Sequence, residues 1–191
     1  MMQGNSLFLL LAGVSGVGKT TVMQELKVLD KRFKYISPDM TRSLRDGEAD
    51  KNYVPTDDLL AARDAGRYLI VNHINKVYYA TPKETIINAF NVGDFPLLDF
   101  PIEKTNIISN FVEGKVFIAY MLPPSIQELK ARLSYDNRDK EGLRLKAASA
   151  ELNKYHNHEY DDKIDLHIVS ETGQAKAIAI DIYTAFLSKL R

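Results

Sequence analysis

The hydrophobic positions of the chain fall into short apolar runs separated by segments with helical spacing. Residues 6–12 form a continuous apolar run, which is typical of a strand buried on both faces. Over 19–30 the apolar side chains recur at helical spacing, so the chain is predicted to open with a strand, a loop and a helix. The same criteria predict further strands at 96–100, 115–121 and 166–169, and helices at 82–91, 125–133, 143–157 and 175–190, with a short helix ending near Gly114. Strands alternating with helices predict an α/β fold with a mostly parallel central sheet.

The segment 35–81 interrupts this alternation. Residues 37–53 are polar and without period, which predicts a loop or irregular lobe, whereas 67–79 are rich in strand-forming side chains. A helix is predicted to begin at Thr56 and to end at Gly66. Further helix starts are predicted at Thr81-Pro82-Lys83-Glu84 and at Ser125 with Glu128, both as capping boxes. We therefore expect one domain, with a core of about 1–34, 82–133 and 158–191, an inserted lobe of about 35–81 and a short lid of about 134–146.

A glycine-rich segment follows the first predicted strand and matches the pattern G-x-x-x-x-G-K-[ST] at every fixed position. It reads Gly13-Val14-Ser15-Gly16-Val17-Gly18-Lys19-Thr20. Glycines let successive backbone N–H groups point at phosphate oxygens, and the helix N-terminus adds a partial positive charge. Lys19 is placed to bridge the β- and γ-phosphates, and the Thr20 hydroxyl to bind Mg²⁺. The sequence predicts a phosphate-binding loop (P-loop) for a nucleoside triphosphate, formed by Gly13, Ser15, Gly16, Val17, Gly18, Lys19, Thr20 and Thr21.

The composition of the chain limits the kinds of ligand and surface that it is expected to bind. The 191 residues include 25 Lys and Arg and 25 Asp and Glu, so the net charge is zero. This balance argues against nucleic-acid and membrane-surface binding, which both favour a basic excess. The chain has no cysteine, which excludes disulfides and thiolate metal sites. No apolar stretch is long enough to span a bilayer, and we expect a cytoplasmic protein, monomeric or homodimeric.

Several motifs in the same order resemble those of the guanylate kinase family. The chain has Thr41-Arg42-Ser43-Leu44-Arg45-Asp46-Gly47-Glu48 where the family has T-R-x-x-R-x-G-E, followed by Tyr53 and by Tyr78-Tyr79-Ala80-Thr81 for Y-Y-G-[ST]. Pro123-Pro124-Ser125, Ala150-Glu151, Tyr160-Asp161 and Ile168-Val169-Ser170-Glu171 extend the match toward the end of the chain. The resemblance implies a P-loop kinase fold and transfer of a phosphoryl group from ATP to a nucleoside monophosphate, GMP by family default.

The resemblance also implies roles for individual side chains. It assigns the phosphate of the acceptor to Arg42, Arg45, Tyr53 and Tyr79, and guanidinium forks are well suited to grip a phosphate dianion. It places catalytic charges on Lys19 and on the lid arginines Arg132, Arg138 and Arg144, of which Arg138 aligns only loosely. Asp99 resembles a carboxylate that holds Mg²⁺ through water. The competing interpretations are surface charges for the arginines and a structural hydrogen bond for Asp99.

The residues that read guanine in the family are replaced here. Their serine, glutamate and aspartate positions fall on Pro38, Ile70 and Pro101. Unpaired N–H groups of a buried guanine would cost about 1–3 kcal/mol each, so we expect altered base specificity. The candidate base-binding residues are Asp39, Asn72, Thr81 and Glu103. Two alternatives stay open, namely a kinase of another phosphorylated small molecule such as a sugar phosphate, and a non-catalytic guanylate-kinase-like binding module.

Overall fold

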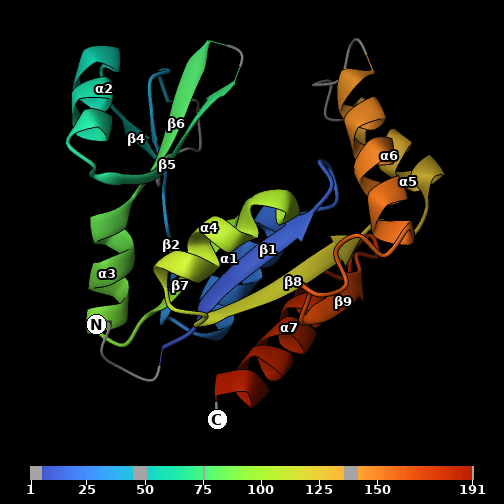
Figure 1. Cartoon of the computed structure of the whole chain (residues 1–191). Coiled ribbons are helices and arrows are strands. Elements are labelled where there is room, and N and C mark those ends of the chain that lie inside the picture. The colour runs from blue at the N-terminus through green and yellow to red at the C-terminus, as the bar shows by residue number, and fades with distance from the viewer. Residues whose placement is uncertain (1–5, 45–50, 75, 136–141, 191) are drawn as a thin grey trace.

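A parallel sheet forms the core of the computed structural model, which describes residues 6–44, 51–74, 76–135 and 142–190. Its five strands follow the order β2-β7-β1-β8-β9, and all neighbouring pairs are parallel (Figure 1). The α/β fold with a mostly parallel sheet is therefore confirmed. The strands are β1 (Phe8–Gly13), β2 (Phe33–Tyr35), β7 (Phe95–Asp99), β8 (Val116–Leu122) and β9 (Leu166–Val169).

Helices cover both faces of this sheet. Alternate side chains of β1 point to opposite faces, and Leu9 and Leu11 pack with the helices α1 (Lys19–Leu29) and α7 (Ala175–Leu190). Phe8 and Leu10 pack on the other face with α3 (Lys83–Asn91) and α4 (Thr105–Phe111). Two apolar layers around the sheet explain why β1 reads as one continuous hydrophobic run. No helix in the described ranges combines the length and the hydropathy needed to cross a membrane.

A second, four-stranded sheet lies in the segment predicted as an inserted lobe. Its order is β4-β3-β6-β5, with β3 (Asp39–Met40), β4 (Asn52–Tyr53), β5 (Tyr68–Ile74) and β6 (Val77–Pro82). The prediction of a loop or irregular lobe at 37–53 was wrong at β3 and β4, because strands of two residues carry no readable alternation. The β-rich stretch 67–79 is the β5–β6 hairpin, whose turn includes Lys76 at φ 64°. The helix α2 (Thr56–Asp64) has the predicted start.

Of the two predicted capping boxes, the structure confirms one cap and contradicts the other. Ser125 caps α5 (Ile126–Tyr135), because the Glu128 backbone N–H donates to the Ser125 Oγ at 3.1 Å. The Glu128 carboxylate does not complete a capping box and bonds Arg132 instead. Thr81 is not a cap, since β6 continues through Pro82 and α3 begins at Lys83 without a side-chain capping bond. The remaining helices are the 3₁₀ turn η1 (Ile102–Lys104) and α6 (Leu143–His156).

Asp30, directly after α1, connects the end of that helix with Arg32 in the following loop and with Tyr183 of α7. Its carboxylate accepts hydrogen bonds from the Arg32 guanidinium, at 2.7 Å to Nη2, and from the Tyr183 hydroxyl at 2.9 Å. These bonds, chiefly that from Arg32, lower the pKa of Asp30 to about 2. The folded state therefore keeps this carboxylate charged at pH values where the unfolded chain is already protonated.

The substitution Asp30→Asn is expected to lower the free energy of unfolding at pH 7 by about 1 kcal/mol, the usual net contribution of a hydrogen bond. Since the folded pKa lies below the unfolded one, the contribution is present above pH 4 and is lost as the pH falls toward 2. Urea unfolding at pH 7, 4 and 2.5 measures this. Asp181→Asn, on the exposed side of α7, is the control, and a difference between wild type and Asp30→Asn that persists unchanged at pH 2.5 would contradict the prediction.

Candidate active site

The P-loop occupies the connection between β1 and α1. Gly13, Gly16 and Gly18 have φ values of 128°, 85° and 101°, which side chains with a Cβ rarely adopt. A Cβ at Gly13 would also lie 2.3 Å from the Met121 carbonyl oxygen of β8, so the loop requires glycine there. α1 begins directly at Lys19, and the backbone therefore presents the first turn of a helix to the loop.

A cavity of about 330 Å³ opens beside this loop. The Lys19 ammonium donates to the carbonyl oxygens of Gly13 at 2.7 Å and Val14 at 3.1 Å. Burial lowers the pKa of Lys19, while the charges of Asp99 and Glu151 oppose this shift. Asp99 ends β7 and enters the cavity because the carboxyl ends of β1 and β7 share one edge of the sheet. The lining residues are Ser15, Gly16, Gly18, Lys19, Thr20, Thr21, Asp99, Arg132 and Arg144.

Two arginines reach the same cavity from α5 and α6. Arg144 donates from Nε and Nη2 to the Ser15 hydroxyl at 3.1 and 2.6 Å. Arg132 donates to the Val17 carbonyl at 3.4 Å and to the Ser170 carbonyl at 2.8 Å. Arg132, which also pairs with Glu128 at 2.6 Å, and Arg144 therefore bring guanidinium groups to the P-loop. Arg138 lies outside the described residues.

The second sheet carries the residues predicted to hold the acceptor phosphate. The Arg42 Nε donates to the Tyr79 hydroxyl at 3.3 Å, so these two side chains meet. Met40 pairs with both Tyr53 and Tyr79, which places both tyrosines on one face of the sheet. Tyr53 is 54% exposed. Arg45 lies outside the described residues, so three of the four predicted side chains are placed.

The amino-acid sequence matches known proteins of one family. The family model described as "Guanylate kinase" matches residues 6–178. The chain belongs to the guanylate kinase family. It is 31% identical over 169 residues to the guanylate kinase of Caldanaerobacter subterraneus, covering 83% of this chain and 81% of the relative. The guanylate kinase of Cereibacter sphaeroides is 30% identical over 166 residues, covering 83% and 79%.

A solved structure shares the fold. The guanylate kinase of Anaplasma phagocytophilum superposes with a TM-score of 0.71 at 19% identity, over 97% of this chain and 86% of that one. The resemblance noted from the sequence motifs is thereby confirmed. So is the enzyme class, an ATP-dependent nucleoside monophosphate kinase of the guanylate kinase type.

A recess of about 180 Å³ continues the P-loop cavity toward the end of β9. The Ser170 hydroxyl donates to the Val17 carbonyl at 2.7 Å, and Arg132 also donates to Thr172 Oγ1 at 2.8 Å. The turn 170–173 therefore forms one wall of the recess beside Gly18 and Thr21. Ser170 and Glu171 belong to the motif Ile168-Val169-Ser170-Glu171 noted in the sequence, whereas Thr172 and Gly173 were not identified there.

The four candidate base-binding residues do not lie together. Asn72 and Thr81 lie on the face that bears Tyr79, since Asn72 pairs with Tyr79 and Thr81 with Ile70. Asp39 precedes Met40 in β3, so it points to the opposite face, where Tyr68 donates to it at 2.7 Å. Glu103 turns toward α6 and accepts from Lys154 and from Tyr160. The structure thus separates Asp39 and Glu103 from the predicted acceptor face.

The oxygen donors for Mg²⁺ were predicted at Thr20 and Asp99, and both line the P-loop cavity. A hydroxyl and a carboxylate are hard ligands of the kind Mg²⁺ takes, with water and phosphate oxygens completing its shell. In the described ranges, no three His, Asp or Glu side chains cluster into a metal site. The two residues therefore fit a metal that arrives with the triphosphate.

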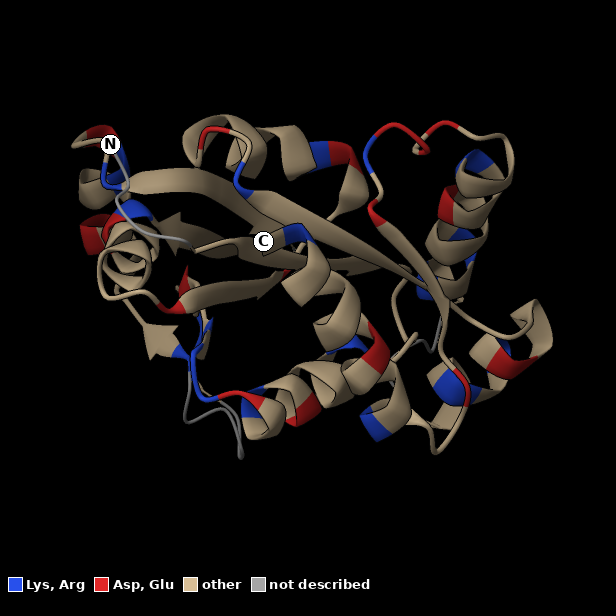
Figure 2. Cartoon of the chain, turned by 90° about the horizontal axis from the view of Figure 1, so that it is seen from below, with Lys and Arg blue, Asp and Glu red and all other residues tan. Residues whose placement is uncertain are grey.

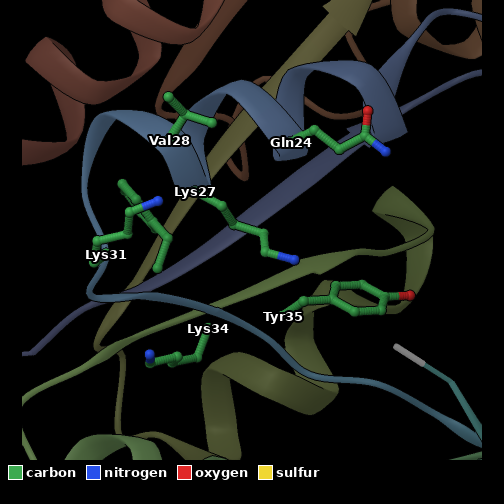
Figure 3. A pocket seen from close by; sticks show the side chains of 7 residues that line it. Gln24, Lys27, Val28, Lys31, Lys34 and Tyr35 are labelled. Atoms are coloured by element: carbon green, nitrogen blue, oxygen red, sulfur yellow. The ribbon is translucent and has the colours of Figure 1, made fainter. Parts of the chain in front are cut away.

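Charge elsewhere on the molecule is dispersed, with basic and acidic residues interspersed along the ribbon (Figure 2). A separate groove of about 460 Å³ runs between α1 and β2, away from the P-loop cavity. Figure 3 shows the Lys27 side chain extending from α1 toward the strand that carries Tyr35. The groove shares no residue with the predicted site; it is lined by Gln24, Lys27, Val28, Lys31, Phe33, Lys34 and Tyr35.

Proposed function

We propose that the chain transfers the γ-phosphoryl group of ATP to a nucleoside monophosphate, for which GMP is the family default. The observation that carries this proposal is the P-loop cavity, which collects Lys19, Thr20, Asp99, Arg132 and Arg144 around one anion-binding loop. Phosphoryl transfer needs little covalent participation by the protein. It depends on positioning and on neutralising charge at the transferred group, and this set of side chains supplies both.

The donor is held by the loop between β1 and α1. The loop amides bind phosphate oxygens, and Lys19 exchanges its loop carbonyl partners for the β- and γ-phosphates. Arg132 and Arg144 approach the triphosphate from α5 and α6 and absorb negative charge as the bond to the leaving group breaks. When bound, Mg²⁺ supplies further charge neutralisation, and Thr20 and Asp99 are the residues that would hold it.

The acceptor is held by the second sheet. Arg42 and Tyr79, with Tyr53 on the same face and Arg45 in the following segment, grip its phosphate. An oxygen of that phosphate attacks the γ-phosphorus in line. The intact P-loop favours this enzyme over a binding module, because a module has no need of Lys19 in a buried cavity.

The substitution Arg42→Lys is expected to raise the KM for the acceptor about tenfold or more, because the guanidinium fork makes two charge-assisted bonds worth about 1.5–3 kcal/mol each. The KM for ATP is expected to stay unchanged. Steady-state kinetics with each substrate varied in turn measures both. Arg63→Lys, in α2 of the same lobe, is the matched control, and an equal rise in both KM values would argue against a role in acceptor binding.

The proposed function is tested by incubating the protein with ATP and a panel of nucleoside monophosphates and sugar phosphates. Products are separated by anion exchange, so that a new diphosphate is distinguished from simple ATP hydrolysis. Saturable transfer to a nucleoside monophosphate supports the proposal. Transfer only to a sugar phosphate supports the alternative kinase, and ATP binding without transfer to any acceptor supports the binding module.

A further inference from the structure

A side chain from the core joins the acceptor face of the second sheet. Asn72 of β5 pairs directly with Tyr79 of β6, whose hydroxyl meets Arg42. The Lys104 ammonium, at the end of η1, donates to Asn72 Oδ1 at 2.7 Å. Lys104 follows Asp99 by five positions, so this contact links the acceptor face to the edge of the sheet that bears the P-loop cavity.

This contact fixes the orientation of the Asn72 amide. An ammonium group has three donors and no acceptor, so the amide atom that faces it is the oxygen. The amide nitrogen, Nδ2, is then turned away from Lys104, and no described residue accepts a hydrogen bond from it. The oxygen keeps a second lone pair, and the ammonium keeps two further hydrogens. Asn72 is half-buried and Lys104 is exposed, which leaves both open to a ligand.

The three groups form a row of donor, acceptor and donor: Asn72 Nδ2, Asn72 Oδ1 and Lys104 Nζ. A complementary ligand edge presents an acceptor, a donor and an acceptor. The imide edge of uracil, thymine or xanthine, a ring N–H between two carbonyl oxygens, has this pattern. Guanine instead presents a carbonyl, an N–H and an exocyclic amine, so in either orientation its amine would face a donor, the Lys104 ammonium or Asn72 Nδ2.

Within the described ranges, no carboxylate on this face of the second sheet is placed to accept a hydrogen bond from the guanine amine. Ile70 lies two residues from Asn72 on the same face, opposite the buried Thr81. Asp39 points to the opposite face and Glu103 turns to α6, where its carboxylate already accepts two hydrogen bonds. A guanine amine placed here would lack an acceptor and would face another hydrogen-bond donor.

We propose that Asn72 and Lys104 read the base of the acceptor, and that they select nucleoside monophosphates with an imide edge over GMP. This inference rests on the proposed kinase function and names its substrate class. Arg42 and Tyr79 hold the phosphate, and the donor–acceptor–donor row holds the base edge on the same face of the sheet. Uridine, thymidine and xanthosine monophosphates are the matching acceptors.

Three purine nucleotides give a sharp test, because xanthosine, inosine and guanosine monophosphates share the C6 carbonyl and N1–H and carry an oxygen, a hydrogen or an amine at C2, xanthosine with an added N3–H. The expected order of kcat/KM is xanthosine, then inosine, then guanosine, with at least about tenfold between the first and the last. Uridine and thymidine monophosphates are expected to exceed GMP by a similar factor. GMP preferred tenfold over every imide nucleotide would overturn the inference while leaving the kinase function intact. No transfer to any nucleotide would overturn the kinase function as well.

Two variants test whether Lys104 and Asn72 produce the selectivity between acceptor bases. Lys104→Met removes the outer donor and is expected to bring kcat/KM for the xanthosine and guanosine nucleotides within about threefold of each other, because the charged donor opposite C2 is gone. Asn72→Asp replaces the first donor by an acceptor while keeping a partner for Lys104, and is expected to lower kcat/KM for every imide nucleotide about tenfold or more. Lys31→Met is the control. Unchanged ratios of the purine nucleotides in Lys104→Met, at unchanged melting temperature, would show that Lys104 has only a structural role.

Discussion

Replacing Lys19 by methionine is expected to lower kcat for phosphoryl transfer by about a hundredfold to a thousandfold, the usual effect of removing one charge-stabilising donor. Lys19 is the cation at the centre of the P-loop cavity, and its ammonium lies among loop carbonyls, Asp99 and Arg144. Methionine keeps the length of the side chain and removes its charge. Diphosphate formation under saturating ATP and acceptor measures the effect.

The melting temperature of the variant shows whether the loss of kcat comes from the missing charge or from unfolding. Burial lowers the pKa of Lys19, which means that the folded state disfavours its charged form. The methionine variant is therefore expected to melt at or above the temperature of the wild type. Lys27→Met, on the same helix but lining the separate groove, is the matched control. Activity of Lys19→Met within tenfold of the wild type would remove Lys19 from the mechanism.

The substitution Arg144→Ala is expected to lower kcat by about a hundredfold or more, since arginines that neutralise a transferred phosphoryl group contribute 10³–10⁵ in other phosphotransferases. Arg144 reaches the P-loop from α6 and bonds the Ser15 hydroxyl through two nitrogens. An interaction made mainly in the transition state lowers kcat and kcat/KM together. Steady-state kinetics therefore shows whether the loss lies in chemistry or in ATP binding.

Added guanidinium ion gives a second readout for the same variant. If the charge of Arg144 acts on the triphosphate, guanidinium is expected to restore part of the rate of Arg144→Ala but none of the rate of Lys19→Met. Lys146→Met, exposed on the same helix, is the control for changes in α6. A rise in the KM for ATP with normal kcat would show that Arg144 binds ground-state ATP and leaves the transition state to other groups.

The parts predicted best from the sequence are those whose chemistry is local. The whole P-loop was identified because its glycines, Lys19 and Thr20 lie close together in the chain. Each is required either by the conformation of the loop backbone or by phosphate binding. The parallel sheet was predicted because strands buried on both faces read as continuous apolar runs, as β1 does. The Ser125 cap was predicted because its partner is only three residues away.

The parts that were missed depend on contacts between distant segments. β3 and β4 have two residues each, and their stability comes from pairing rather than from any pattern in the chain. Lys104 lies 32 positions from Asn72, and an exposed lysine in a polar turn gives no sign of its partner. Asp39 was named as a candidate base-binding residue, but strand alternation turns it to the other face.

The separation of the molecule into two sheets has a consequence for how such enzymes acquire new substrates. In chain order the second sheet begins after residue 38 and ends at Pro82, while the P-loop, Asp99 and the arginines of α5 and α6 belong to segments outside it. A change at position 70 or 72 alters one strand face and leaves the donor cavity untouched. Apart from Lys104, which the core contributes, the residues proposed to choose the acceptor can therefore change in evolution without altering those that move the phosphoryl group.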